Sequence, residues 1–403
     1  MLARDAGVAM LLTPVWRNVA LLAVCQALAM SGASLIATTS ALVGNGLAEN
    51  KAYATVPLAL QYGATMLATI PAAHLMRRFG RRAACMGAAG IGMLGAALSM
   101  IAILQGDFHF FGASSAITGL FFGFVIQFRF AAADVTEARD RGKAISWVLA
   151  GGVIAAVLGP NLARATRDWF EPVLFAGCYF ALIFVCAAVM AVLAFVRIPT
   201  PSAEERRGDG RSFREIVKQP VCLTAILCGP LSYAVMSTLM TATPLAMLAC
   251  DHGFGDTAFV IQWHILGMYA PSFVTGFLIA RLGVLNVMAA GSALFVLCIA
   301  INLAGNSVAH FWASLTLMGV GWNFVFVGAT TLLTESYRPA EKAKMQGIND
   351  FLVYGTVTIS ALISGKLHHF IGWEALNLAA IPFVAATVAA GLWLRARRAA
   401  QPA

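Results

Sequence analysis

Sulfur and imidazole side chains occur at helical spacing in two neighbouring apolar stretches of the chain. Met236 and Met240 are four residues apart, and so are His264 and Met268. On an α-helix this spacing places two side chains on one face, one turn apart. Thioether and imidazole ligands without carboxylates select soft metals, Cu(I) above all, because Mg, Ca and Mn prefer oxygen ligands. The pattern therefore predicts a buried site for a soft cation.

Ordinary packing is the competing interpretation of these methionines. Methionine is a flexible apolar filler, and Met190, Met247 and Met318 are interpreted in that way. His264 favours the metal interpretation, because an ionisable ring within an apolar stretch marks a functional site by default. Its own methionine lies one turn away, which makes a joint metal site of Met236, Met240, His264 and Met268 the better hypothesis.

The depth of the two pairs decides whether they can meet. The connection between the two stretches, residues 251–256, is short, so the sequence predicts an antiparallel hairpin. At 1.5 Å per residue, Met240 lies about 15 Å and His264 about 11 Å from the tip of this hairpin. Both pairs are therefore expected near the middle of a membrane, where transporter sites usually lie.

Two of the eight cysteines flank the methionine pair. The others are interpreted as small buried apolar side chains. Cys228 and Cys250 form a candidate thiol relay for entry and exit of a soft ion. They are 22 residues apart in the sequence. Along a straight helix that is about 33 Å, which is too far for a disulfide.

The low fraction of charged residues indicates that most of the chain lies in a membrane rather than in water. Charged side chains make up 11% of the 403 residues, and the set AVILMFWYC makes up 60%. A soluble domain carries about 25% charge. The composition excludes a soluble fold, a disordered chain and a secreted disulfide scaffold.

Charge-free windows give the number of membrane crossings, because a span needs about 20 apolar residues. One window, 282–334, is long enough for two spans, with a polar turn around Asn306. Another, 345–365, contains only Asp350 near its start. The predicted fold is all-α, with twelve transmembrane helices. The windows are 18–48, 52–76, 83–106, 108–128, 144–163, 172–196, 219–250, 257–280, 282–334, 345–365 and 375–394.

The basic residues predict the orientation. Alternating the connectors places 23 Lys and Arg on the side of the termini and 4 on the other side. This asymmetry predicts that both termini are cytoplasmic. The net charge of +9 is then an orientation signal, and no nucleic-acid partner is expected. The first span imitates a signal peptide, but its length predicts that it is retained.

A polar stretch at residues 197–218 divides the spans into two groups of six. The predicted organisation is an N-terminal half at 1–196, a cytoplasmic linker at 197–218 and a C-terminal half at 219–403. Two related halves are typical of transporters built from repeats. Arg78-Phe79-Gly80 and Arg281-Leu282-Gly283, 203 positions apart, form a short echo between the halves.

The loop after the second span resembles a signature of the major facilitator superfamily. That signature reads roughly G-x-x-x-D-R-x-G-R-R, and Arg78, Gly80, Arg81 and Arg82 match it, whereas Arg77 stands at the acidic position. The resemblance implies a conformational loop, and the lost acid puts the usual latch in doubt. The competing interpretation is that these basic residues only hold the loop on the cytoplasmic side of the membrane.

The fifth span also resembles the glycine-proline pattern of the superfamily's antiporters. It carries Gly151-Gly152 and Gly159-Pro160, with Ala163 in place of the closing glycine. Small residues at such spacing also let helices approach closely, which is the plainer interpretation.

With both Met and His pairs in view, the sequence resembles the CcoA-type copper importers, a bacterial branch of that superfamily. The paired M-x-x-x-M and H-x-x-x-M motifs carry the resemblance, and residues 128–134 (FRFAAAD) are also similar to that branch. It implies import of copper, as Cu(I), across the bacterial inner membrane by alternating access. It also implies supply of copper to cbb3-type cytochrome oxidase assembly, with copper chaperones as candidate partners.

Two other functions stay open. A proton-coupled drug exporter would use the glycine pattern, the aromatic content and Asp350 as a candidate coupling residue. A copper sensor would keep the fold and the site but move no ion. An enzyme is not expected, because no catalytic triad, metal-hydrolase motif or phosphate loop is found. No cofactor is expected either, since copper is the transported substrate.

Overall fold

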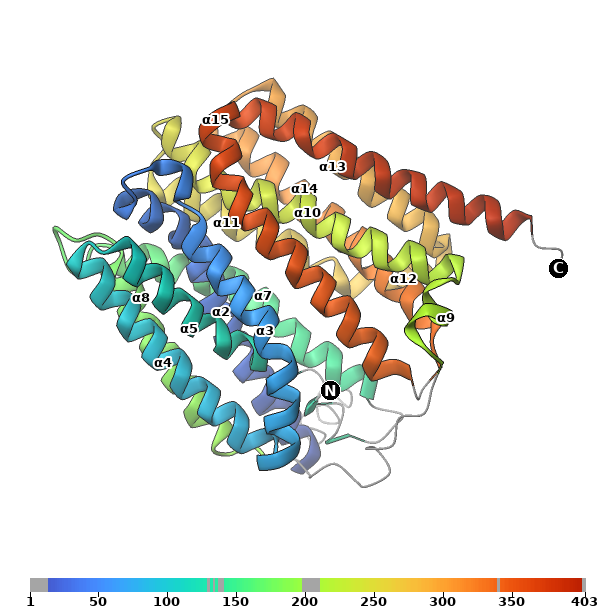
Figure 1. Cartoon of the computed structure of the whole chain (residues 1–403), viewed down its shortest axis with the longest axis horizontal. Helices are drawn as coiled ribbons and strands as arrows, with labels where there is room; N and C mark the ends of the chain where they lie inside the picture. Colours follow the sequence, from blue (N-terminus) through green and yellow to red (C-terminus); the bar gives the residue numbers. More distant parts are fainter. Residues whose placement is uncertain are drawn as a thin grey trace, which may run out of the picture. The chain divides into compact units, whose positions relative to one another are not determined.

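The chain is folded into helices. The computed structural model describes residues 14–128, 131–132, 135–136, 141–197, 211–338 and 341–400, and no strand occurs among them. Residues 198–210 of the predicted linker, and 129, 130, 133 and 134 of the 128–134 motif, lie outside this part. Figure 1 shows the helices, which are α2 (Pro14–Leu47), η1 (Lys51–Tyr53), α3 (Val56–Phe79), α4 (Arg81–Gln105), α5 (Phe108–Val125), α7 (Arg141–Thr166), α8 (Ala176–Leu193), α9 (Phe213–Val217), α10 (Pro220–Ala249), α11 (Phe254–Tyr269), α12 (Ser272–Leu282), α13 (Val284–Ala304), α14 (Val308–Ser336) and α15 (Lys342–Ala399).

Every charge-free window falls on a helix or a helix pair. The window 257–280 corresponds to α11 and α12, and 282–334 to α13 and α14. The last two windows both lie on α15, which is interrupted by non-helical backbone at Gly372. By length and apolarity, eight helices of the described part could span a membrane, or nine if α11 and α12 form one bent span. An all-helical bundle with many spans is confirmed, whereas the count of twelve stays a prediction.

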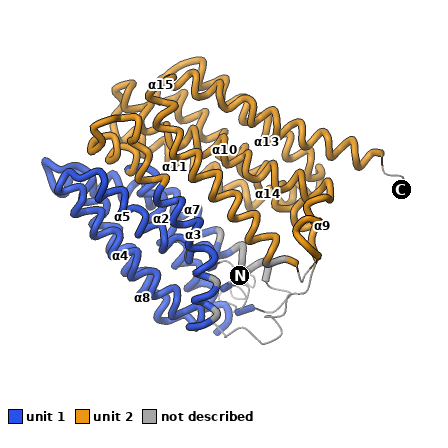
Figure 2. Tube along the Cα trace, viewed as in Figure 1, with its two compact units in different colours: residues 1–39, 60–202 blue, residues 40–59, 203–403 orange. Residues whose placement is uncertain are grey.

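The chain divides into two compact units (Figure 2). Unit 1 comprises residues 1–39 and 60–202, and unit 2 comprises residues 40–59 and 203–403. The sequence-based boundaries place residues 40–59 in the first half. In the structure the end of α2 packs within unit 2, where Ala41 and Ala54 form a small apolar cluster with Leu245 of α10.

Close helix crossings hold unit 1 together. The Thr65 hydroxyl of α3 donates to the Gly119 carbonyl of α5, at 2.9 Å. A side chain at Gly119 would collide with the backbone oxygen of Gln61, so only glycine permits this crossing. On α7, a Cβ at Gly151 would lie 2.8 Å from the Ala27 nitrogen of α2. Gly159 meets α2 in the same way, so these glycines serve helix packing.

The short echo between the halves corresponds to two matching helix junctions. Gly80 is the single residue between α3 and α4, with φ 82° and ψ 150°. Gly283 is the single residue between α12 and α13, with φ 85° and ψ 146°. Such positive φ values favour glycine, which has no Cβ. The loop motif thus has a backbone role, while Arg81 and Arg82 begin α4 and Arg78 lies over the Phe79 ring.

Unit 2 is organised around α14. Helices α10, α11 and α13 all pack against α14, and α10 also packs extensively along α15. A buried amide pair links α13 to the second part of α15, because Asn302 Nδ2 donates to Asn377 Oδ1 at 2.8 Å. Such bonds between helices contribute about 1 kcal/mol in membranes.

A buried carboxylate fixes the segment before α9 to the connection between α14 and α15. The Arg211 guanidinium donates to both oxygens of Glu341, at 2.8 and 2.7 Å. The backbone N–H groups of Arg211 and Arg338 also donate to this carboxylate. The Arg211 side chain, together with these N–H groups, holds the pKa of the Glu341 carboxyl far below its usual range.

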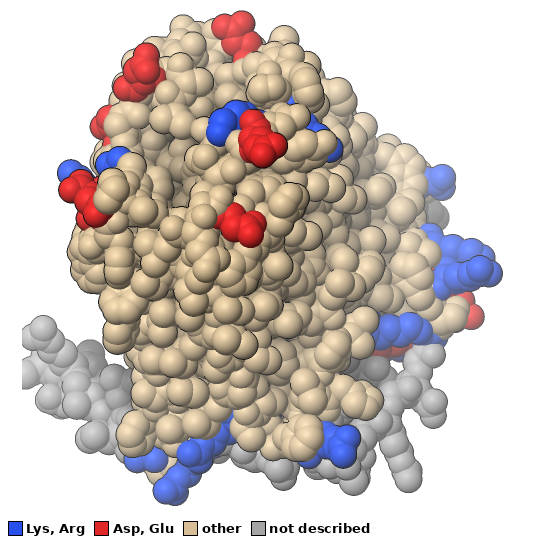
Figure 3. Space-filling view, turned by 60° about the vertical axis from the view of Figure 1, so that its left-hand side comes forward, with Lys and Arg blue, Asp and Glu red and all other residues tan. Residues whose placement is uncertain are grey.

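Charged side chains keep to the ends of the helices. In the face shown in Figure 3, Asp and Glu lie mainly in the upper part together with some Lys and Arg, other Lys and Arg lie at the lower end and the right-hand edge, and an uncharged area lies between the upper and lower groups. An uncharged area suits contact with lipid hydrocarbon.

Loss of the Arg211–Glu341 pair is expected to loosen unit 2. Replacement Arg211→Gln leaves a carboxylate that is 1% exposed without its main partner, so the thermal midpoint in detergent falls by several degrees at pH 7. The folded-state pKa is depressed, so the stabilisation is present above the ordinary glutamate pKa and is lost as the pH falls below it. The difference between the two proteins should therefore shrink in acid. Exposed Arg214→Gln is the control, and equal midpoints of all three proteins would contradict the assignment.

Candidate functional site

The four predicted metal ligands are buried in unit 2. Met236 and Met240 lie on α10 and are 4% and 8% exposed. His264 and Met268 lie on α11 and are 0% and 7% exposed. Each pair therefore occupies a buried helix face, as the four-residue spacing requires.

The predicted short connection between the two helices is present, but the helices do not pack closely along their length. The turn from Ala249 to Phe254 is short, but α10 and α11 make little direct contact and both pack against α14. Glycines on α11 and α14 explain the difference, because they let these two helices approach closely. The structure therefore relates the Met pair to the His pair through α14.

His264 is held in one orientation by α14. Its Nδ1 lies 2.8 Å from the Leu315 carbonyl oxygen. A carbonyl only accepts hydrogen bonds, so Nδ1 carries the proton and donates it. The other ring nitrogen, Nε2, then presents a lone pair. Nε2 is buried and has no partner among the described residues.

Two glycines set the position of His264 on α14. A Cβ at Gly267 would lie 2.6 Å from the Thr316 carbonyl oxygen, and one at Gly319 would collide with the His264 carbonyl oxygen. Backbone therefore meets backbone at this crossing. Close approach through small residues is the usual way in which membrane helices pack.

A helix break follows Met268 directly. Helices α11 and α12 meet at Pro271 with a bend of 42°. Asn323 of α14 covers the break, because its Nδ2 donates to the Met268 carbonyl at 2.7 Å and to Ser272 Oγ at 2.6 Å. A neighbouring side chain thus satisfies backbone that the break releases.

An aromatic cluster borders the same region. Trp322 of α14 stacks on Phe326 with 5.0 Å between ring centroids, and Tyr233 of α10 meets its edge at the same distance. Tyr269, the residue after Met268, also contacts Trp322, at 6.5 Å. The Trp322 Nε1 is buried and has no hydrogen-bond partner in the described part of the chain. The cluster thus combines aromatic faces with an unused donor.

The remaining predicted residues lie on α10 and α15, two helices that pack extensively against each other. Cys228 is buried on α10, and its thiol lies 3.8 Å from the Thr387 carbonyl of α15. Cys250 ends α10 and is partly buried. Asp350 lies on α15 and is partly buried. The proposed roles of the two thiols and of Asp350 stay predictions.

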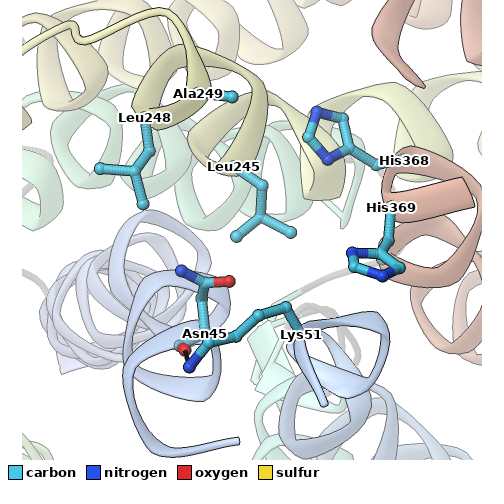
Figure 4. A pocket seen from close by; sticks show the side chains of 8 residues that line it. Asn45, Lys51, Leu245, Leu248, Ala249, His368 and His369 are labelled. Carbon is cyan, nitrogen blue, oxygen red and sulfur yellow. Dashed lines mark hydrogen bonds between the residues drawn. The ribbon is translucent and has the colours of Figure 1, made fainter. Parts of the chain in front are cut away.

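A recess of about 310 Å³ opens at the end of unit 2 where α2 and α10 finish. Lys51 lies there and donates to the carbonyls of Asn45 and Ala48, at 2.6 and 2.7 Å. Figure 4 shows the His369 ring on the side of Lys51 and the His368 ring nearer the end of α10. The four predicted metal ligands do not line this recess.

Sequence reasoning missed several polar groups of this unit. Asn323, Trp322 and the His368-His369 pair were not singled out. The doubled histidine just after an apolar window was a visible signal for the last. Asn323 carried only the weak signal of an amide within a span, and its role depends on a break in another helix.

The metal-binding chemistry available in this unit is that of sulfur and a single imidazole. In the described part of the chain, no group of three or more His, Cys, Asp or Glu side chains could hold a metal ion. A metal ion held beside His264 would therefore need thioether ligands, which suit soft ions.

Comparison with known proteins identifies the family. The model of the Major Facilitator Superfamily matches residues 22–270 and 231–403. The chain belongs to the major facilitator superfamily. It is therefore a multi-pass membrane transporter, and this family is one of transporters rather than enzymes.

Proteins similar to this superfamily member are named for different substrates. The riboflavin transporter RfnT of Brucella anthropi is 38% identical over 371 residues, covering 92% of this chain and 93% of the relative. The solved structures of a D-xylose-proton symporter and of the nucleoside transporter NupG are each 12% identical. They cover 93% of this chain and 96% and 99% of theirs, with TM-scores of 0.69 and 0.70. These structures show the fold, while the copper-importer branch stays a prediction.

The glycine crossing gives a direct test of how α11 is positioned in this superfamily member. We expect Gly267→Ala to lower stability by about 1–3 kcal/mol, because the new methyl group must push α14 away. Gly276→Ala on α12 is the matched control, since a Cβ there meets nothing within 4 Å. Thermal unfolding of both purified proteins in detergent provides the measurement. Equal stability of the two variants would rule out a tight crossing.

Proposed function

We propose that the chain imports copper as Cu(I), with Met236, Met240, His264 and Met268 as the residues that hold the ion. The observation that carries this proposal is the state of His264. Its Nδ1–H donates to the Leu315 carbonyl, and its buried Nε2 has no partner in the part of the chain that the structure describes. Metal-binding histidines almost always use their second N–H in this way, which fixes the ring and its tautomer.

The chemistry of the neighbouring side chains supports a soft ion. Thioether sulfur is uncharged and suits Cu(I). Burying uncharged ligands costs little free energy, and a moderate affinity for the ion allows its release, as transport requires. The release step would be a change between outward-open and inward-open states.

The remaining features of the proposal rest on the resemblance. They are location in the bacterial inner membrane with cytoplasmic termini, exchange with copper chaperones, and supply of copper for cbb3-type oxidase assembly. The drug exporter gains no support, since Gly151 and Gly159 pack against α2. A copper sensor would bind the ion without moving it, so copper uptake into proteoliposomes separates it from an importer.

Copper uptake should depend on the sulfur and imidazole atoms. We expect His264→Ala and Met236→Leu to abolish accumulation of radioactive copper in cells lacking other importers, while both proteins still reach the membrane. Leucine keeps the volume of methionine and removes only the thioether. Met247→Leu on the same helix is the matched control and should transport normally. Normal uptake by both site variants would refute the copper assignment.

Riboflavin transport is the second candidate. Its support is the named activity of the Brucella anthropi relative together with the aromatic cluster around Trp322. A flavin is a planar aromatic molecule with ring carbonyls, which suits stacking faces and an unused N–H donor. The buried Nε1 of Trp322 offers such a donor.

A substitution in the aromatic cluster, rather than in the Met and His pairs, tests riboflavin uptake. If flavin is carried, Trp322→Leu is expected to lower uptake of riboflavin, followed by its fluorescence, by at least about tenfold, because stacking and one hydrogen bond are both lost. Trp312→Leu, on the same helix and 38% exposed, is the control. Riboflavin uptake that is unchanged in Trp322→Leu, or absent from the unaltered protein, would exclude this candidate.

A further inference from the structure

Two buried hydroxyl groups of unit 2 have no hydrogen-bond partner in the described part of the chain. They belong to Ser40, near the end of α2, and to Thr241 on α10. The two residues are 0% and 1% exposed. An unpaired polar atom at such depth is uncommon and needs an explanation.

Thr241 departs from the behaviour of its neighbours. A threonine within a helix commonly donates its hydroxyl to the carbonyl one turn earlier. On the same helix, Thr224 donates to the Pro220 carbonyl at 2.9 Å and Thr243 to the Leu239 carbonyl at 2.8 Å. Thr241 makes no such bond, so its hydroxyl is left for another partner.

The two hydroxyls flank one helix contact. Ala41 of α2 and Leu245 of α10 pack in the same apolar cluster. Ser40 directly precedes Ala41, and Thr241 lies one helical turn before Leu245. Thr241 also directly follows Met240, one of the four residues of the proposed ion site. The unused hydroxyls therefore lie on the two helices that meet beside that site.

Proline affects the backbone at the same place. Pro244 has no N–H to offer to the carbonyl of Met240, which an ordinary residue would bond within the helix. The stretch from Met240 to Pro244 thus combines an unpaired hydroxyl with a missing backbone donor. Helix α10 continues through Pro244, so the backbone oxygen that proline leaves without its usual donor is available to another partner.

We propose that Ser40 and Thr241 form a hydroxyl site that binds an O–H group of the substrate beside Met240. A hydroxyl both donates and accepts, so it complements a group that does the same. Two sources share this chemistry, namely a water molecule on the transported ion and an alcohol group of an organic substrate such as riboflavin. The inference rests on the transport function proposed above and adds the contact that selects for oxygen.

Transport kinetics of hydroxyl variants test the site. We expect Thr241→Val and Ser40→Ala each to raise the KM of uptake about tenfold, the loss expected for one hydrogen bond at a desolvated position. Thr243→Val is the matched control, because its hydroxyl already bonds to Leu239, and it should keep the KM of the unaltered protein. A rise for copper alone assigns the water, and a rise for riboflavin alone assigns the alcohol. An unchanged KM for every transported substrate would overturn the site.

Thermal stability supplies a readout that needs no substrate. An unpaired buried hydroxyl loses nothing when valine replaces threonine, so the midpoint of Thr241→Val should equal or exceed that of the unaltered protein. A drop in Thr241→Val would show that the hydroxyl has a protein partner and would overturn the proposal. If the unaltered protein carries no copper, the proposed function fails, while the riboflavin and stability measurements still decide the hydroxyl site.

Discussion

The crossing of α11 and α14 is the constraint on which the rest of unit 2 depends. Gly267 and Gly319 remove the side chains that would separate the two backbones. The crossing brings the His264 ring to the Leu315 carbonyl and so decides which nitrogen carries the proton. It also brings Asn323 to the Met268 carbonyl at the start of the break before α12. One close contact thus orients the imidazole and stabilises the interrupted helix beside it.

Helical composition and family could be predicted from the sequence because they depend on local properties. Apolar length alone predicts where helices run, and Arg78, Gly80, Arg81 and Arg82 were enough to indicate the superfamily. The R-x-G echo was a weak signal in the sequence. It gained weight because Gly80 and Gly283 adopt nearly the same backbone angles between successive helices.

The site could be predicted only in part, because its geometry depends on residues far apart in the chain. Spacing placed each pair of candidate ligands on one face, but the short turn between α10 and α11 does not decide which helix each of them packs against. The partner of α11 is α14, and small residues on α14 decide this. The unpaired hydroxyl of Thr241 could not be foreseen either, since Thr224 and Thr243 of the same helix form the usual bond.

The paired junctions at Gly80 and Gly283 allow the halves to be compared position by position. Counting 203 positions back from His264 gives Gln61, whose carbonyl also lies against a glycine of a crossing helix, Gly119 of α5. Met236, Met240 and Met268 correspond to Ala33, Ala37 and Thr65. At these four equivalent positions, sulfur and imidazole occur only in the C-terminal half. The two halves thus share the geometry of these helix junctions but differ in side-chain chemistry at the positions of the proposed ion site.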